Sequence, residues 1–266
     1  MEIEFGKKIK KTSYYKQRCE LAAVLRWTAR LNMHESVVNH FSVSVDRNRS
    51  KFLINPGGLH FSLIKASDLI LIDGHNIKRS LNDLPNEKRP LVTALDLHTS
   101  VHKLKKNAAC ILHVHSKYAT VLSTIKNKKG RDPQWSGYLP PVDQNSMRFY
   151  ERISIDQDYD GMAKGNEAKR IAKQLGDKKI LLLGNHGVMV IGLTVAKAFD
   201  DLYYFEKACE TYVTALSTGK ELQMASHKIA SNTAKQWENF KPSNIADLHL
   251  KSLMAILDKE DPDYKE

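Results

Sequence analysis

The sequence predicts one α/β domain with a C-terminal extension, because segments with helical periodicity alternate with short apolar segments of strand character. The chain has 266 residues, of which 42% are hydrophobic and 27% charged, so it can bury a sizeable core. No internal repeat or low-complexity stretch divides it. We place the domain at residues 1–220 and the extension at 221–266, which we expect to pack on the domain or on a neighbouring subunit.

Apolar residues at helical spacing predict the helices, beginning with the amphipathic segment YYKQRCELAAVLRWTARL. The predicted helices cover residues 14–31, 94–106, 116–125, 161–175, 194–217 and 245–257. Ser116 and Thr194 stand at the starts of two of these helices and are candidate N-caps. Residues 221–240 are polar, and we expect this stretch to be mobile in part.

Short apolar segments rich in β-branched residues predict the strands. These strands cover residues 40–45, 51–55, 69–73 and 109–115, followed by two short strands within 179–192 that are interrupted at 184–187. The segment NPGG at 55–58 is expected to turn, because proline fixes φ and glycine permits a positive φ.

The formal net charge of +11 raises the question of a nucleic-acid partner. The lysines are spread along the chain, however, and no nucleic-acid-binding motif accompanies them. We therefore expect a solvated lysine-rich surface and no nucleic-acid partner. Attraction of an anionic substrate is an alternative use of this charge.

Two further features of the sequence bear on the location of the protein. No apolar run approaches the roughly 18 to 20 residues of a membrane span, and the basic N-terminus lacks the apolar core of a secretion signal. Cys19, Cys110 and Cys209 form no CxxC pair, so we expect free buried thiols. These features predict a cytoplasmic protein without a membrane partner.

Three histidines form a candidate metal site. The segment CILHVH ends in His113 and His115, whose side chains share one face of a strand because residues i and i+2 do so. His186 lies in LLLGNHGVMV, between a buried strand and a glycine, where a tight turn would expose its ring. Three histidines with an open fourth position are typical of a catalytic divalent site. The alternative is a set of ordinary core or surface histidines, because the chain contains 11.

Several motifs occur in a specific order along nearly the whole chain. They are ESVVNHFSVSV, FLINPGGLHF, ASDLILID, HVHSKYATVLS and NHGVMVIGLTVAKAFDDLYYFEKACETYV. Together they resemble the class II aldolase/adducin family. The C-terminal KSLMAILDKEDPDYKE is similar to bacterial members that are closer to adducin than to the sugar-phosphate aldolases.

The resemblance implies a three-layer α/β/α class II aldolase-like fold with a mostly antiparallel central sheet, assembled as a homotetramer with active sites between subunits. The family's three metal-binding histidines match His113, His115 and His186. In the aldolases the ion, usually zinc, polarises a carbonyl and stabilises the enediolate left when a C–C bond breaks. We therefore expect a divalent ion, zinc before manganese or iron, and a small anionic carbonyl substrate.

The sequence departs from the aldolases where they carry their acid/base and their phosphate pocket. Ala94 stands at the position of the family's glutamate, and Asp96 would point about 200° away from it on a helix. The family's Gly-Asn-x-Ser is replaced by the residues 39–42, and Gly57-Gly58 stands in place of Thr-Gly or Ser-Gly. These changes argue against ordinary phosphosugar aldol chemistry.

Two residues are candidates for the missing acid/base. His98 can replace the glutamate as acid/base or metal ligand, because its helical position is within reach of the site. Its alternative is a supporting or core role. Tyr138 falls near the place where relatives carry a catalytic acid, and its alternative is a structural role.

Other residues are candidates for substrate binding. Gly57 and Gly58 can offer backbone N–H groups to an anion, and His40 can supply charge or a hydrogen bond. In LPPVDQNSMRFY, Gln144 is a further candidate, and Arg148 is either a bidentate clamp for a carboxylate or a member of an ion pair.

These features leave three classes of function. The preferred interpretation is a metal-dependent lyase that cleaves or decarboxylates a small hydroxy- or oxo-acid. The alternatives are an epimerase or non-haem iron oxygenase of the same fold, and a non-catalytic adducin-like interaction module. The histidine triad favours an enzyme, because a scaffold has no physical need for three converging imidazoles.

Overall fold

A seven-stranded sheet lies at the centre of the computed structural model, which describes residues 13–125, 139–160, 163, 165–239 and 245–266. Its strands are β1 (His40–Ser44), β2 (Lys51–Ile54), β3 (Ile70–Asp73), β4 (Cys110–Val114), β5 (Ile153–Asp156), β6 (Ile180–Leu183) and β7 (Gly187–Gly192). The strand order is β3-β2-β1-β4-β7-β6-β5. Neighbouring strands are antiparallel except β5 and β6, which are parallel. The mostly antiparallel sheet confirms the expected fold class.

Nine α-helices are found in the described residues, and the predicted ones are all among them. They are α2 (Tyr15–Arg30), α3 (Ile77–Leu81), α4 (Val92–Leu104), α5 (Lys117–Thr124), α6 (Gln144–Arg148), α7 (Asn166–Gln174), α8 (Val195–Ser217), α9 (His227–Asn239) and α10 (Ile245–Glu260). Part of the start of the helix predicted over 161–175 lies outside the described residues. The N-cap prediction for α8 is confirmed, because the Thr194 side chain accepts a hydrogen bond from the Lys197 N–H at 3.1 Å.

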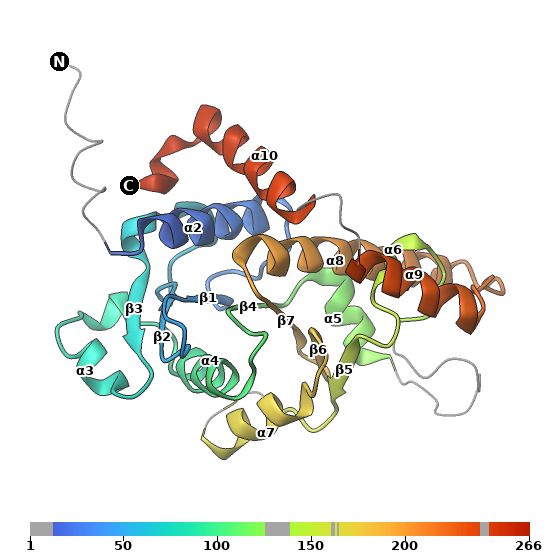
Figure 1. Ribbon diagram of the computed structural model, residues 1–266, viewed down its shortest axis with the longest axis horizontal. Helices are drawn as coiled ribbons and strands as arrows, with labels where there is room; N and C mark the ends of the chain where they lie inside the picture. The colour runs from blue at the N-terminus through green and yellow to red at the C-terminus, as the bar shows by residue number, and fades with distance from the viewer. Residues whose placement is uncertain (1–12, 126–138, 161–162, 164, 240–244) are drawn as a thin grey trace.

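Helices cover both faces of the sheet and form a three-layer α/β/α arrangement (Figure 1). Residues of α2, α5, α8 and α10 pack on one face, where Leu112 and Val114 of β4 contribute to the core. Residues of α4 and α7 cover the other face, where Ile111 of β4 is buried. Because alternate residues of a strand point to opposite faces, His113 lies on the same face as Ile111. This placement directs the first candidate ligand toward the α4 side of the sheet.

Within residues 221–240, expected to be polar and mobile in part, the structure places α9 over His227–Asn239, and the partial mobility stays a prediction. This helix is amphipathic, and Ala230 and Ala234 form a small core with Tyr150. The Arg152 guanidinium also pairs with the Glu238 carboxylate at 2.7 Å. The buried face of α9 consists of Ala230, Thr233 and Ala234 and carries no large apolar side chain. For this reason the segment has a polar composition in the sequence.

The C-terminal helix α10 packs against α2 of the same chain. The indole N–H of Trp27 donates to the carbonyl oxygen of Leu253 at 2.9 Å. The buried guanidinium of Arg26 contacts the carboxylates of Asp261 and Asp263, each at 2.6 Å. The extension is thus held by both a hydrogen bond and ion pairs.

The thiol prediction is confirmed, because Cys19, Cys110 and Cys209 are all free and buried. Burial raises the pKa of the Cys110 and Cys209 thiols, which favours their uncharged form. In the described parts of the chain, no helix combines the length and apolar character needed to cross a membrane.

A carboxylate from α8 caps the N-terminus of α5. The sequence suggested that the Ser116 side chain caps this helix, but it makes no capping hydrogen bond. Its hydroxyl instead donates to Glu206 Oε2 at 2.6 Å. The N–H groups of Tyr118 and Ala119 donate to the same carboxylate at 2.8 and 3.1 Å. Because α5 begins directly after His115, this cap fixes the chain where it leaves β4.

We expect Glu206→Gln to lower the free energy of unfolding by about 2 kcal/mol. The amide has one oxygen in place of two, so its NH₂ group faces a backbone N–H of α5 that is left without an acceptor. The control is Glu210→Gln, one turn later on α8, where the partly exposed carboxylate pairs with Lys207 at 2.9 Å. That change is expected to stay within about 0.5 kcal/mol. Urea unfolding measures both variants, and equal effects would contradict the capping role.

Candidate metal centre

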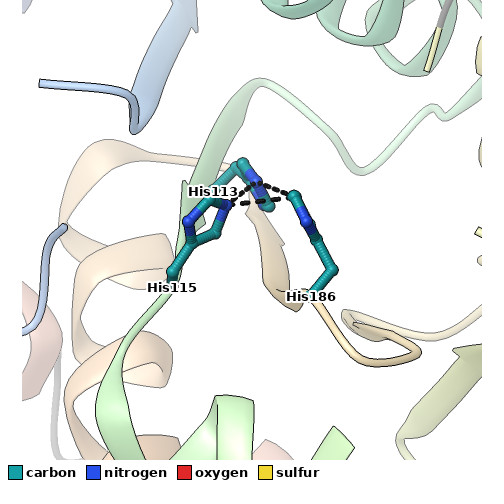
Figure 2. A group of neighbouring side chains, drawn as sticks. All are labelled: His113, His115 and His186. Carbon is teal, nitrogen blue, oxygen red and sulfur yellow. Dashed lines mark hydrogen bonds between the residues drawn. The ribbon is translucent and has the colours of Figure 1, made fainter. Parts of the chain in front are cut away.

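His113, His115 and His186 point their Nε2 atoms toward one another (Figure 2). The Nε2 atoms of His113 and His115 are 3.2 Å apart, those of His115 and His186 are 3.0 Å apart, and those of His186 and His113 are 3.2 Å apart. Nitrogen ligands of tetrahedral zinc, each about 2.0–2.1 Å from the ion, lie about 3.3 Å from one another. The three nitrogens thus have the spacing of one shared ion.

Local backbone features bring His186 to the other two histidines. Asn185 adopts a left-handed conformation with φ of 55°, which asparagine tolerates better than most residues, and it turns the chain between β6 and β7. Gly187 follows His186 and packs against β4. A Cβ atom at Gly187 would lie 2.5 Å from the Val114 carbonyl oxygen and 2.9 Å from His115 Cδ2. Glycine is therefore required for this close approach.

The hydrogen bonds of two rings fix their tautomers. His113 Nδ1 lies 3.1 Å from the Val188 carbonyl oxygen, which can only accept, so the N–H of this ring is at Nδ1. His115 Nδ1 lies 2.5 Å from the Glu35 carboxylate and donates to it. Both Nε2 atoms are then unprotonated in the neutral rings, although they are 3.2 Å apart. Two facing lone pairs repel, and a cation between them removes this repulsion.

Burial keeps the His113 and His186 rings neutral. It lowers the pKa of His113 well below the ordinary value, and neighbouring histidines add to the effect. Burial, followed by the nearby His115, lowers the pKa of His186 to about 4. The ring of Tyr159 covers His186, with centroids 4.3 Å apart. Neutral imidazole is the form that binds metal ions.

A chain of buried hydrogen bonds begins on α4 and runs toward this centre. His102 Nδ1 donates to the Ala108 carbonyl oxygen at 2.8 Å, which leaves His102 Nε2 as an acceptor. The Ser42 hydroxyl donates to this nitrogen at 2.8 Å. Its oxygen then accepts from His98 Nδ1 at 2.5 Å. The carbonyl at the start thus sets the direction of each following bond.

The chain ends at His40, beside the candidate ligands. His98 Nε2 accepts from His40 Nδ1 at 2.7 Å, so the Nε2 of His40 is unprotonated. His40 is paired with His113 across β1 and β4, and their ring centroids are 4.7 Å apart. We call His102, Ser42, His98 and His40 the histidine chain. It holds an acceptor nitrogen on the same face of the sheet as the centre.

The predicted acid/base candidates differ in their placement. His98 is fully buried, and both of its ring nitrogens are occupied within the histidine chain. It is therefore placed to act through His40. Ala94 is buried in the first turn of α4 and offers no proton, while the Asp96 carboxylate accepts the Gly165 N–H at 3.0 Å. Tyr138 lies outside the described residues.

The glycine pair has its donors occupied. The Gly57 N–H donates to the Arg89 carbonyl oxygen at 3.0 Å, and the Gly58 N–H donates to that of Val37 at 3.4 Å. The positive φ of 77° at Gly58 confirms the expected turn. The sequence suggested that these N–H groups bind an anion. In the structure they stabilise the turn and are not free to do so.

Arg148 and Gln144, the two candidates for substrate binding from LPPVDQNSMRFY, lie beside residues of α8 and α9. Arg148 is buried, and its Nη2 is 2.6 Å from carboxylate oxygens of both Asp200 and Asp201. This is the ion-pair alternative for Arg148 rather than a free clamp for a substrate carboxylate. Gln144 is exposed and lines a cavity of about 150 Å³ with Thr233 and Trp237 of α9.

The structure adds residues that the sequence analysis did not propose. Glu35 is 80 positions from His115 in the sequence, and no local pattern signals their contact. The Tyr159 contact with His186 is equally non-local. His102 had a signal, because it lies one helical turn after His98 and therefore on the same face of α4.

We expect Glu35→Gln to lower zinc affinity by about tenfold or more, because the carboxylate orients His115 and increases the basicity of its ring. Competition with a chromophoric chelator measures this affinity. Glu221→Gln, at an exposed carboxylate outside the centre, is the control and should leave the affinity unchanged. A wild-type affinity in the Glu35 variant would contradict the orienting role.

Acid should destabilise the protein through its buried histidines. Burial lowers the pKa of His102 to about 4, so below pH 6.5 the unfolded chain binds a proton that the folded chain does not. For His102 alone, the free energy of unfolding should be about 2 kcal/mol lower at pH 5 than at pH 7.

Urea unfolding of metal-free protein at pH 7 and pH 5 tests this contribution. In His102→Gln, the decrease between the two pH values should be smaller by about 2 kcal/mol than in the wild type. Identical decreases in the two proteins would show that His102 does not contribute.

Comparison with known proteins connects this geometry to a family. Residues 19–213 match the model of the Class II Aldolase and Adducin N-terminal domain. A Pseudomonas aeruginosa protein named for the aldolase class 2 group is 30% identical over 256 residues, which cover 95% of this chain and 93% of the relative. Decarboxylase NovR of Streptomyces niveus is 26% identical over 236 residues, covering 85% of this chain and 82% of the relative.

Structural comparison agrees. The crystal structure of an aldolase II superfamily protein from Pseudomonas syringae matches with a TM-score of 0.84 and 26% identity, covering 97% of this chain and 98% of the other. The chain belongs to the class II aldolase/adducin family.

Proposed function

We propose that the protein is a metal-dependent lyase that breaks a C–C bond next to a carbonyl in a small hydroxy- or oxo-acid, by retro-aldol cleavage or decarboxylation. The observation that carries this proposal is the convergence of the Nε2 atoms of His113 and His115, which are 3.2 Å apart. His186 supplies the third nitrogen of the set. Such a set is typical of a catalytic site with an open coordination position.

The donor set supports zinc as the ion, with manganese or iron as alternatives. Three neutral imidazoles suit zinc, and burial keeps His113 and His186 neutral. When bound, such an ion polarises a carbonyl and stabilises the negative charge left after bond cleavage. Glu35 would orient His115 toward the ion, and the Val188 carbonyl would orient His113.

His40 is the residue that we propose to face the substrate. Its Nε2 can accept the hydrogen of a substrate hydroxyl, because its N–H is held at Nδ1 by His98. His98 and His102 are then positioning residues that act through this bond. His40 Nε2 would thus supply a hydrogen-bond acceptor near α4, where Ala94 stands in place of the glutamate that the family resemblance implies.

Two observations support the substrate class. The similar Streptomyces protein is named as a decarboxylase, and decarboxylation also leaves negative charge next to a carbonyl. The net charge of +11 favours the approach of an acidic substrate. By family resemblance we further propose a homotetramer with active sites between subunits, located in the cytoplasm.

The first test is metal content. We expect plasma mass spectrometry of untagged protein to find about one ion per chain, and His113→Ala to lose it, because one of three ligands is removed. His75→Ala, at an exposed histidine, is the control and should keep the ion.

The identity of the ion then directs the activity assay. With zinc or manganese, we expect release of CO₂ or an aldehyde from a panel of small 2-oxo and hydroxy acids, and loss of this activity in His113→Ala. Wild-type protein that binds no ion after reconstitution would overturn the proposed lyase. Iron together with oxygen uptake would favour the oxygenase alternative.

A further inference from the structure

A second site is indicated by a cavity of about 440 Å³ on the α4–α7 side of the sheet. Its walls come from the β1–β2 connection, the end of β3, and the helices α4 and α7, which pack side by side (Figure 1). We call it the basic cavity and define it by Arg49, Phe52, Thr99, Lys103, Lys169 and Lys173. None of the three candidate metal ligands lines it. Its volume is in the range of small-molecule sites.

The charge of the basic cavity has one sign. Arg49, Lys103, Lys169 and Lys173 line it, and no aspartate or glutamate is among its lining residues. None of these four cations forms an ion pair with another described residue. Four positive charges around one cavity repel one another, and an anion between them would relieve this repulsion.

Helical spacing explains how these side chains converge. Lys169 and Lys173 are four residues apart on α7, so both lie on the same face of that helix. Thr99 and Lys103 have the same spacing on α4. The α7 pair Lys169 and Lys173 thus faces Lys103 of α4 across the basic cavity, and Arg49 borders it from the β1–β2 connection. This arrangement differs from a scattered lysine-rich surface.

The interior of the basic cavity is suited to an organic group. Phe52 is fully buried at its wall, and the side chain of Leu104 also lines it. The hydroxyl oxygen of Thr99 is buried without a hydrogen-bond partner among the described residues. Buried hydroxyl groups normally have a partner, and rotation of the Thr99 side chain would bring this one to a molecule in the basic cavity. The occupant therefore needs an apolar part, a polar group and negative charge.

We propose that the basic cavity binds a small organic anion that carries at least two negative charges and a flat apolar group, the chemistry of a nucleoside phosphate. The anionic part contacts the lysines and Arg49, and the flat group packs against Leu104 at the wall that Phe52 backs. This site is additional to the proposed lyase centre. It also adjoins the histidine chain, because the rings of Phe52 and His102 have centroids 4.9 Å apart.

ADP in magnesium-free buffer is the probe, and isothermal titration calorimetry of the full chain measures its binding. We expect saturable one-to-one binding that weakens as salt is raised, because the contacts are ionic. Pyrophosphate and adenosine, tested separately, should each bind more weakly than ADP, since each lacks one of the two recognised parts. Absence of ADP binding at low salt would overturn the proposal.

The double variant Lys103→Glu/Lys173→Glu should weaken ADP binding by about 30-fold or more. The control Lys251→Glu/Lys259→Glu makes the same change of charge at exposed positions of α10 and should keep wild-type affinity. Equal losses in both would show that only the overall charge of the protein attracts ADP. That result would contradict a site at the basic cavity.

Two further variants test whether Thr99 belongs to the ADP site and whether ADP binds at the metal centre instead. Thr99→Val should weaken ADP binding by about threefold or more while keeping or raising stability, because it removes a buried hydroxyl that has no partner. Unchanged affinity would remove Thr99 from the site. His113→Ala disrupts the proposed metal centre, and it should bind ADP as the wild type does. Loss of binding there would assign the ADP site to the metal centre instead.

Discussion

The antiparallel pairing of β4 with β1 on one side and β7 on the other is the constraint on which the candidate centre depends. It places His113 opposite His40 in one ladder and opposite Met189 in the other. The same ladder brings the Val188 carbonyl to the His113 ring and positions the turn that carries His186. A one-residue shift of register would turn His113 to the opposite face and dismantle the centre.

The polar groups behind the centre are tolerated in the core because they satisfy one another. Ser42, His98 and His102 are buried, and each ring nitrogen of the two histidines has a partner. A buried polar network that is fully bonded adds rigidity, whereas an unpaired member would be costly. The network also sets the tautomer of His40 from a backbone carbonyl that cannot donate. A structural hydrogen bond on α4 thus determines which nitrogen is presented beside His113.

Ala94 stands at the position where the family resemblance implies an acid/base glutamate. Ala94 carries no ionisable group, while the face of α4 one and two turns later carries His98 and His102. In the proposed site, the His98 imidazole acts on the centre through its hydrogen bond with His40. Their burial keeps them neutral, as the lowered pKa values of His98 and His102 indicate. The acceptor at this site is therefore expected to remain uncharged at pH 7.

The sequence by itself determined the family, most of the helices and strands, and the three candidate metal ligands. The helices and strands follow from local patterns, namely helical spacing and short β-branched runs. The family follows from the ordered motifs that resemble it, and this resemblance joins the HxH pair and His186 into one candidate site. β5 escaped prediction because its four residues, ISID, acquire their role only by pairing with β6.

The tertiary structure decided which residues surround the histidines and which do not. Glu35 reaches His115 and Glu206 caps α5 across long sequence separations. Arg148, a plausible clamp from its sequence, is occupied by Asp200 and Asp201. No pattern in the sequence encodes these contacts, because they depend on how separate elements pack in space.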